Sequence, residues 1–337
     1  TGMSSAEPQK RDLVFGVVAF NPNLTCYHRS QRCDRNAIFV GLRLWLVSVI
    51  RHLDMARTEV VVFTGRGAGS ILIDARVAYW LRTWKVHVIE RDFGDSSERV
   101  AHNEPQRHVW CVMRNRWFVI SQYMQRHSWR YRYVLMTDIR DAVIQDNPFA
   151  PREVGSPASE LLVAKGVVFS GEGSGKVQVL RHSKKGLPRT VGCARRISKG
   201  DRRRLEDTEP LNAGVTAGEA RAFSNFSTAL AALIRHTTSV ECLRIKDCTD
   251  QGLYNLLVYQ YWRTYLPHTE QVILPMEHAL SYTLGHKPVC PKVDSKGRVL
   301  NKGGRVPPVV HQYTKGKAGK QLRHTHFATV YLHDPGW

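Results

Sequence analysis

Short apolar runs alternate with longer helical patterns through the first half of the chain. Four of the runs are brief and rich in β-branched residues, as buried strands are: 13–20, 59–63, 85–90 and 131–137. Three stretches between them have the periodicity of helices: 36–55, 70–84 with Ser70 as its N-cap, and 104–126. Strands that alternate with helices predict an α/β fold with a doubly wound, mostly parallel sheet. Such sheets bind ligands beyond the carboxyl ends of their strands.

The second half of the chain is less regular. It predicts strands at 161–170, 211–217 and 308–312, and helices at 219–236 and 250–262. The tail from Lys287 is rich in glycine, proline and lysine, and no internal repeat or linker interrupts the chain. We therefore expect one domain over 12–337 with a loop-rich C-terminal half, preceded at 1–11 by an expression remnant and a polar stem.

The composition adds a strong positive charge to this picture. The chain of 337 residues has 49 Lys and Arg against 29 Asp and Glu, a formal net charge of +20. This charge predicts attraction to polyanions such as nucleic acid, an anionic glycan or membrane, or a phosphorylated ligand. Eleven of the cations lie in the stretch 176–204, which has one acid, Asp201. The stretch is interpreted either as a solvated basic loop or as a dock for an anionic partner.

Other features concern the cellular address. No apolar run reaches the roughly 18 residues that a membrane span needs. Two sequons, Asn23–Thr25 and Asn225–Ser227, support the lumen of the secretory pathway only weakly. The seven cysteines allow local disulfide bridges, which spacing alone cannot pair. We expect the chain to be the soluble part of a membrane-anchored protein of the Golgi or the endoplasmic reticulum.

The clearest chemical feature is the segment 133–149, YVLMTDIRDAVIQDNPF. A hydrophobic strand runs directly into Asp138 and Asp141, at the edge of the sheet where ligands bind. Mg²⁺ and Mn²⁺ prefer oxygen ligands and retain phosphate oxygens, so this acidic pair suits a site for a cation and a diphosphate. A plainer interpretation makes Asp138 the cap of the next turn and Asp141 a solvated side chain.

Three further segments follow in order. They are 167–173 (VVFSGEG), 211–218 (LNAGVTAG) and 248–255 (CTDQGLYN). With the acidic segment, they resemble GT-A glycosyltransferases, which have a Rossmann-like fold. A strict DxD motif would place its second acid at Arg140, so the DxxD spacing resembles most the glycosyltransferase domain of lysyl hydroxylases. The four segments together are fairly specific, although each alone is weak.

The resemblance implies a function and a set of site residues. The chain would transfer a sugar from a nucleotide-diphosphate donor, expected to be a UDP-sugar, to a glycan or glycoconjugate acceptor, which is anionic if the basic stretch binds it. The first half, 12–150, would bind the nucleotide, and the second half, 151–337, would bind the acceptor. The residues that the resemblance assigns are Asp138, Asp141 and His311 as ligands of Mn²⁺ or Mg²⁺, Asn212, Ala213, Gly214, Gln251 and Lys315 beside the donor, and Asp250 and Glu172 as catalytic carboxylates.

Several of these roles have alternatives. Asp141 is either a direct ligand or a group behind the ligands, and Asp250 either faces the anomeric carbon or caps a helix. Arg116 either binds the diphosphate through its guanidinium fork or is a surface arginine. His311 is preferred over the competing pair His324 and His326 because of its order in the chain. Retention and inversion both fit, and a general-base role for Glu172 would favour inversion.

Other functional classes explain less of the sequence. A polyanion-binding or nucleic-acid-binding module accounts for the net charge of +20 but not for an acidic pair at a strand end. A nucleotide-sugar pyrophosphorylase shares the sheet, but its glycine-rich basic loop after the first strand is missing. The segment 171–176 (GEGSGK) lacks phosphate-loop spacing, and no GxSxG is present. We therefore expect no nucleic-acid partner.

Overall fold

The computed structural model describes about three fifths of the chain. The described residues are 10–18, 35–65, 75–91, 93, 105–149, 166–172, 198–206, 208–237, 250–275, 278, 280–284 and 291–311. The strands are β1 (Arg11–Val18), β2 (Thr58–Gly65), β3 (His87–Arg91), β4 (Tyr131–Asp138), β5 (Ala142–Ile144), β6 (Gly166–Gly171), β7 (Leu211–Glu219), β8 (Glu270–Leu274), β9 (Ser281–Thr283) and β10 (Val309–His311). The helices are α1 (Arg35–His52), α3 (Ala75–Thr83), α5 (Pro105–His127), α7 (Lys199–Glu206), α8 (Ala220–Thr237), α9 (Asp250–Leu256) and α10 (Trp262–Tyr265), with a 3₁₀ turn η1 (Ser128–Arg130) and a π-helical segment η4 (Leu257–Tyr261).

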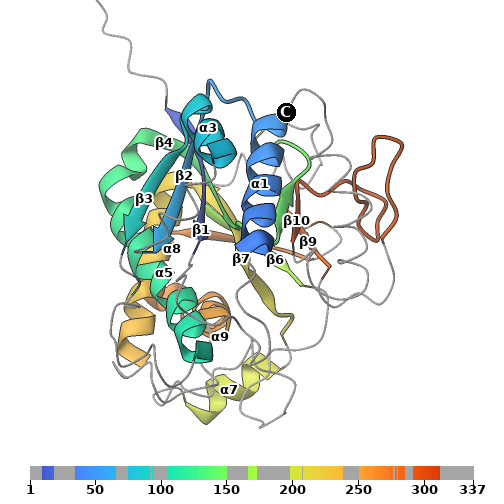
Figure 1. Cartoon of the computed structure of the whole chain (residues 1–337). Helices are drawn as coiled ribbons and strands as arrows, with labels where there is room; N and C mark the ends of the chain where they lie inside the picture. Colours follow the sequence, from blue (N-terminus) through green and yellow to red (C-terminus); the bar gives the residue numbers. More distant parts are fainter. Residues whose placement is uncertain are drawn as a thin grey trace, which may run out of the picture.

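The described strands form two sheets. The large sheet has seven strands in the order β3-β2-β1-β4-β7-β6-β8, and the small sheet has the order β5-β10-β9. In the large sheet β7 runs antiparallel to both of its neighbours, β4 and β6, whereas the other pairs are parallel. The expected α/β class with a mostly parallel sheet is therefore confirmed, and this sheet is compatible with a Rossmann-like fold. Strands from both halves of the chain lie in the same sheet (Figure 1).

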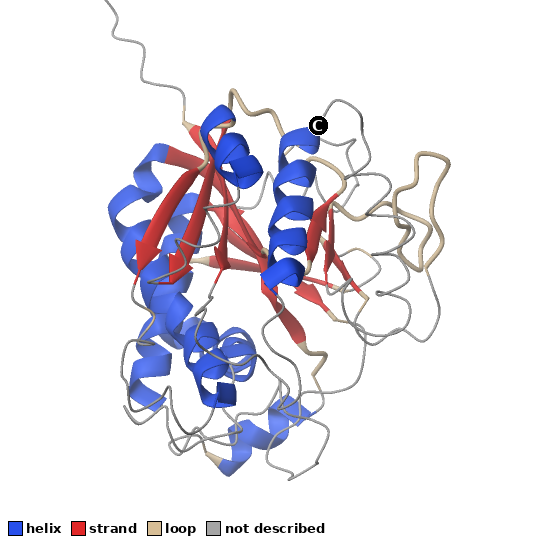
Figure 2. Cartoon of the chain, viewed as in Figure 1, coloured by secondary structure: helices blue, strands red, loops and turns tan. Residues whose placement is uncertain are grey.

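Helices cover both faces of the large sheet (Figure 2). Leu13 and Phe15 of β1 are buried in one core with Trp117 of α5 and Phe226 of α8. On the opposite face, α1 and α3 pack onto the alternate side chains of the same strands, such as Val14 and Val60. Because successive side chains of a strand point to opposite faces, two buried faces require the continuous apolar runs seen in the sequence.

The predicted elements of the first half correspond to observed ones, with ends that differ by a few residues. The strand β2 continues through Thr64 and Gly65, and Ser70, the expected N-cap, lies outside the described residues. The strand β5 was not predicted. It has only three residues and follows the acidic turn directly, so it is too short to show a period of its own.

The second half departs further from expectation. Both β8 and β9 were missed, and the single helix expected at 250–262 is interrupted by the π-helical segment η4. The described part of the basic stretch includes the helix α7 rather than a loop. In this helix the sequence KGDRRRLE offers one buried apolar side chain, Leu205, so its periodicity could not be recognised.

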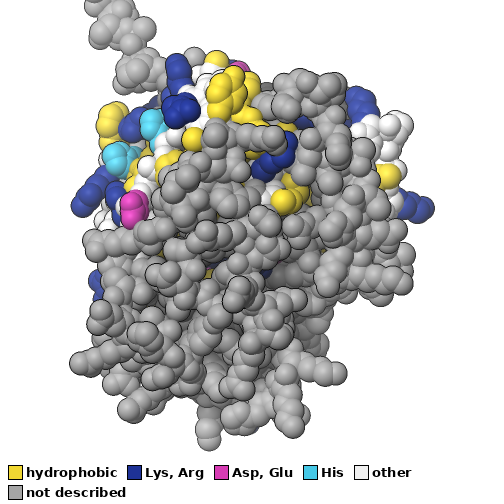
Figure 3. All heavy atoms as spheres, in the orientation of Figure 1, with side chains coloured by type: hydrophobic (Ala, Val, Ile, Leu, Met, Phe, Trp, Pro, Cys, Tyr) yellow, Lys and Arg dark blue, Asp and Glu magenta, His cyan; other side chains and the backbone are white. Residues whose placement is uncertain are grey.

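Basic side chains of the described residues are dispersed over the visible surface. Figure 3 shows Lys and Arg along the upper and lateral margins of this face, with few Asp or Glu among them. Several of these cations follow from helix electrostatics, because α1, α3 and α5 each carry basic residues in the last turn, where the helix dipole is negative. The described basic side chains on this face therefore lie at separate places along its margins (Figure 3).

Two findings bear on the expected cellular address. Within the described residues there is no helix whose length and apolar character would let it cross a membrane. The sequon at Asn225 lies inside α8, and the hydroxyl of Ser227 is buried and donates to the carbonyl of Ser224. Because acceptor sequons lie in surface loops, this second sequon gives no support to a secretory address.

Candidate metal centre at the edge of the sheet

The acidic pair lies where the order of the strands reverses. The chain builds β1, β2 and β3 outward in one direction and then places β4 on the other side of β1. Asp138 is the last residue of β4 and pairs with Val17, next to the end of β1. The crevice at such a reversal is where open α/β sheets bind ligands. The strand that ends in Asp138 therefore leads to the expected binding edge.

Three predicted metal ligands converge at this edge. One ligand atom from each of Asp138, Asp141 and His311 lies within 4.8 Å of the others. The Nε2 atom of His311 is 3.4 Å from Oδ2 of Asp138 and 3.6 Å from Oδ1 of Asp141. Asp141 and His311 are buried, whereas the side chain of Asp138 is 23% exposed. The cluster is thus open to solvent on the side of Asp138.

The helix α1 supports the turn that carries the two carboxylates. The indole N–H of Trp45 donates to Oγ1 of Thr137 at 2.7 Å, and the N–H of Ile144 donates to Oγ of Ser48 at 3.0 Å. A Cβ atom added to Gly41 would lie 2.5 Å from the carbonyl oxygen of Arg140. The turn therefore rests directly on the backbone of α1, which holds Asp138 and Asp141 in place from below.

Gly214 forms the wall of the cluster on the side of β7. A Cβ atom added there would lie 2.6 Å from Oδ2 of Asp138 and 2.7 Å from Nε2 of His311. Only glycine leaves that space, because any side chain would occupy the position between the two ligand atoms. The space beside Gly214 is therefore close to the carboxylate and the imidazole at once, as a cation site requires.

Asn212 orients both Gly214 and His311. Its Oδ1 accepts the N–H of Gly214 at 2.8 Å, so its NH₂ group points the other way, where it donates to Oγ1 of Thr283 at 2.9 Å. The same Nδ2 lies 2.7 Å from Nδ1 of His311. This arrangement favours a ring proton on Nε2, between the two carboxylates, when no cation is bound. Partners of this kind fix the orientation of histidine ligands in metal sites.

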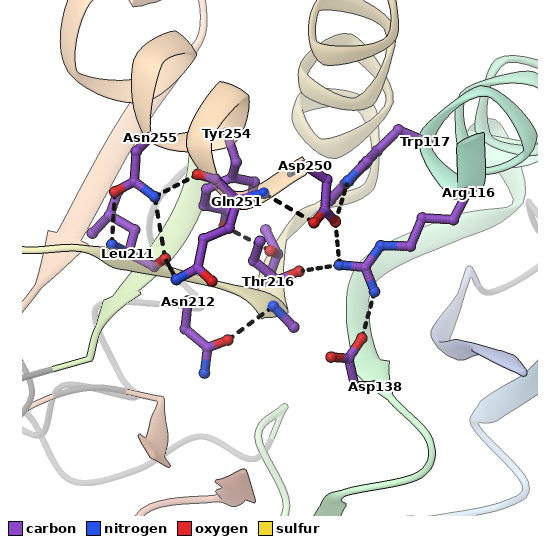
Figure 4. Close-up of polar contacts among 12 residues, drawn as sticks. Arg116, Trp117, Asp138, Leu211, Asn212, Thr216, Asp250, Gln251, Tyr254 and Asn255 are labelled. Atoms are coloured by element: carbon purple, nitrogen blue, oxygen red, sulfur yellow. Dashed lines mark hydrogen bonds and ion pairs between the residues drawn. The ribbon is translucent and has the colours of Figure 1, made fainter. Parts of the chain in front are cut away.

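Arg116 lies behind Asp138 and is not a surface residue. Its side chain is 6% exposed, and its guanidinium donates to Oδ1 of Asp138, to Oδ2 of Asp250 at 2.6 Å and to the carbonyl of Ala213 at 3.0 Å (Figure 4). The alternative of a solvated arginine on the long helix is therefore wrong. The guanidinium joins α5, β4, β7 and the start of α9.

The charges of the cluster alter the pKa values of its members. Burial lowers the pKa of His311, but the facing carboxylates of Asp138 and Asp141 outweigh it and raise this pKa to about 9. Burial raises the pKa of Asp138, but Arg116 and His311 outweigh it and hold that pKa below its ordinary value. For Asp250, burial dominates over Arg116 and raises the pKa.

The donor set fits a hard divalent cation. Nε2 of His311 is buried and has no hydrogen-bond partner among the described residues. The cluster combines the carboxylates of Asp138 and Asp141 with the imidazole of His311, and these are ligand groups that divalent cations bind. The residues present therefore could hold a divalent cation.

The structure brings the other predicted residues to the same region. Asp250, at the start of α9, is 1% exposed and also accepts the indole N–H of Trp117 at 3.2 Å. Gln251 donates to the carbonyl of Leu211 at 2.9 Å. Glu172 is buried directly after β6, and its N–H donates to the carbonyl of Pro210, just before β7. Lys315 and the pair His324 and His326 lie outside the described residues.

Sequence reasoning missed several residues that hold the site together. Asn255 accepts the N–H of Leu211 at 2.8 Å and donates to the carbonyl of Gln251 at 2.7 Å, which fixes the start of β7 against α9 (Figure 4). Its signal in the sequence was an amide four residues after Gln251, on the same face of the helix. Thr283 was missed because β9 itself was missed.

The histidine should make the stability of the metal-free protein depend on pH. A pKa raised from 6.5 to about 9 in the folded state means that the folded chain binds the proton more tightly. The resulting stabilisation is complete below pH 6.5 and is lost as pH rises through 9. We expect a loss of roughly 3 kcal/mol in the free energy of unfolding, at about 1.4 kcal/mol per pKa unit.

Denaturant unfolding in EDTA between pH 6 and pH 9.5 would measure this loss. The matched control is His311→Gln, which keeps a polar side chain without a titrating group and should show a flatter profile over the same range. If the free energy of unfolding changed equally with pH in the two proteins, Asp138 and Asp141 would not raise the pKa of His311.

Comparison of the chain with known protein families found no matching family, and comparison with curated protein sequences found no relative.

Proposed function

We propose that the chain is a metal-dependent glycosyltransferase of the GT-A type. It transfers a sugar from a nucleoside-diphosphate donor, most simply a UDP-sugar, to a glycan or glycoconjugate acceptor. The observation that carries the proposal is the convergence of Asp138, Asp141 and His311, which are up to 173 positions apart, at the switch point of a mostly parallel sheet. Asp138 and Asp141 were predicted from the sequence as an acidic pair at a strand end, and His311 from its order in the chain.

The arrangement of the other residues supports a diphosphate site at this edge. A divalent cation bound there supplies positive charge to a diphosphate leaving group. Gly214 leaves room beside the ligand atoms, and the amide of Asn212 keeps both Gly214 and His311 in position. Asp250 and Glu172 lie at the same edge as buried carboxylates, and we keep them as the proposed catalytic groups.

The polyanion-binding alternative explains the net charge but not the site. The carboxylates of Asp138, Asp141 and Asp250 at this edge would repel phosphates unless a cation were bound. The alternative therefore requires a basic surface separate from this edge. It remains an outcome of the experiment below.

Calorimetric titration with UDP tests the proposal. We expect UDP to bind in Mn²⁺ and to bind at least about tenfold more weakly in EDTA, since the cation links the carboxylates to the diphosphate. Uridine, which lacks phosphates, is the matched ligand and should show no dependence on Mn²⁺. Slow hydrolysis of one member of a panel of nucleotide sugars would then identify the donor.

The same preparation should be titrated with a DNA duplex and with heparin. Equal affinity for UDP in Mn²⁺ and EDTA, together with tight salt-dependent binding of either polymer, would replace the enzyme by a polyanion-binding module.

A further inference from the structure

The two oxygens of Asp138 have different surroundings. Oδ1 accepts a hydrogen bond from Nη1 of Arg116, whereas Oδ2 faces Nε2 of His311 at 3.4 Å. Oδ2 is also the oxygen that lies against the open space at Gly214. Asp138 therefore offers one oxygen to the cluster, and the second oxygen is already engaged.

Arg116 is held so that it cannot release this oxygen easily. Its second terminal nitrogen, Nη2, donates to Oδ2 of Asp250 at 2.6 Å and to the carbonyl of Ala213 at 3.0 Å. The guanidinium also lies over the ring of Trp117, 5.6 Å from its centroid. A planar fork fixed at both ends holds its partner in one orientation, which a flexible ammonium group would not do.

This geometry matters for the choice of cation. Ca²⁺ takes six to eight oxygen ligands and often binds a carboxylate through both oxygens, whereas Mg²⁺ requires a compact octahedral set. A carboxylate that can offer only one oxygen contributes less to a Ca²⁺ site than to a site for a smaller cation. Because Arg116 engages one oxygen of Asp138, it limits the number of oxygens that Asp138 can present and thereby affects which cation is preferred.

We propose that Arg116 is a specificity-determining residue of the metal centre, which engages Oδ1 of Asp138 and thereby disfavours Ca²⁺ relative to Mn²⁺. The inference rests on the metal site of the proposed function. Arg116 acts through Asp138 and is a positioning residue rather than a catalytic one. Asp250 contributes to the same arrangement, because its carboxylate accepts a hydrogen bond from Nη2 of Arg116.

The test measures the dissociation constants of Mn²⁺ and Ca²⁺ alone, in wild-type protein and in Arg116→Met. The readout is the ratio of the two constants, because a change in net charge or in the folded fraction affects two divalent ions alike. We expect the preference for Mn²⁺ over Ca²⁺ to fall about tenfold in the variant, since Asp138 can then present both oxygens. Arg116→Met/Asp250→Asn serves as a second variant in which no buried carboxylate of α9 is left without its cation.

Arg132→Met is the matched control. Arg132 also forms an ion pair from β4, with Asp12 at 2.8 Å, but it lies at the opposite end of the strand and is 46% exposed. Its ratio should equal that of the wild type. An unchanged ratio in both Arg116 variants, with Mn²⁺ still bound by the wild type, would overturn the inference. Absence of any divalent binding by the wild type would instead refute the proposed function.

Discussion

Asp138→Asn should weaken Mn²⁺ binding by about 100-fold or more, because it removes a charged ligand from the cluster and not merely one of its supports. The buried Arg116 requires an acceptor, so the amide oxygen of the new side chain should take the place of Oδ1. The NH₂ group then points toward His311 and Gly214, where a donor repels a cation. Calorimetric titration with Mn²⁺ measures the effect.

The choice of asparagine follows from the structure. An alanine at this position would leave Arg116 with Asp250 and the carbonyl of Ala213 alone, so a loss of binding could be confused with a loss of stability. Asp146→Asn is the control, since Asp146 follows β5 closely and pairs with Arg298 at 3.9 Å, away from the cluster. Wild-type affinity in Asp138→Asn would remove Asp138 from the metal site.

Asp250→Ala should lower the free energy of unfolding by about 3 kcal/mol, the low end of the range for breaking a buried ion pair. Asp250 is 1% exposed, and its Oδ2 accepts from Arg116 and Trp117. Truncation leaves two buried donors without that acceptor. We place the effect at the low end because Arg116 retains Asp138 and the carbonyl of Ala213. Denaturant unfolding at pH 7 measures the change.

Asp12→Ala is the comparison for this prediction. Asp12 accepts two hydrogen bonds from Arg132, but that arginine is 46% exposed and can return to water when its partner is removed. The expected cost is below about 1 kcal/mol. Equal losses in the two variants would show that the Arg116–Asp250 pair contributes no more than a surface pair. In that case, the addition of Arg116→Met to Asp250→Ala should recover none of the lost free energy of unfolding.

The contacts of Asp250 give it a structural role beside its proposed catalytic one. The sequence offered a carboxylate at the anomeric carbon or a helix cap, and the structure shows a third function, that of counter-ion for Arg116. Its Oδ1 accepts the N–H of Gln251, the next residue, so the capping contribution is local. A kinetic effect of Asp250→Asn therefore has to be measured beside its unfolding free energy before it is assigned to the sugar.

The amino-acid sequence determined the longer strands and the helices of the first half, and it singled out the three side chains of the cluster. Strands of five to eight residues and helices of nine or more show their periodicity in the chain itself. Asp138 and Asp141 could be selected because a strand-end acid has a position in the fold as soon as the strand is recognised. His311 could be selected because its order in the chain matched that of the other segments.

The tertiary structure alone decided how these residues act on one another. Arg116 is separated from Asp250 by 134 positions, and no local pattern indicates that its guanidinium bridges two carboxylates. The strands β5 and β9 have three residues each, so they are defined by their pairing with β10 and not by propensity. Long-range pairing and the burial of charge depend on the whole fold. For that reason the sequence predicted the three side chains of the cluster, and only the structure showed what holds them.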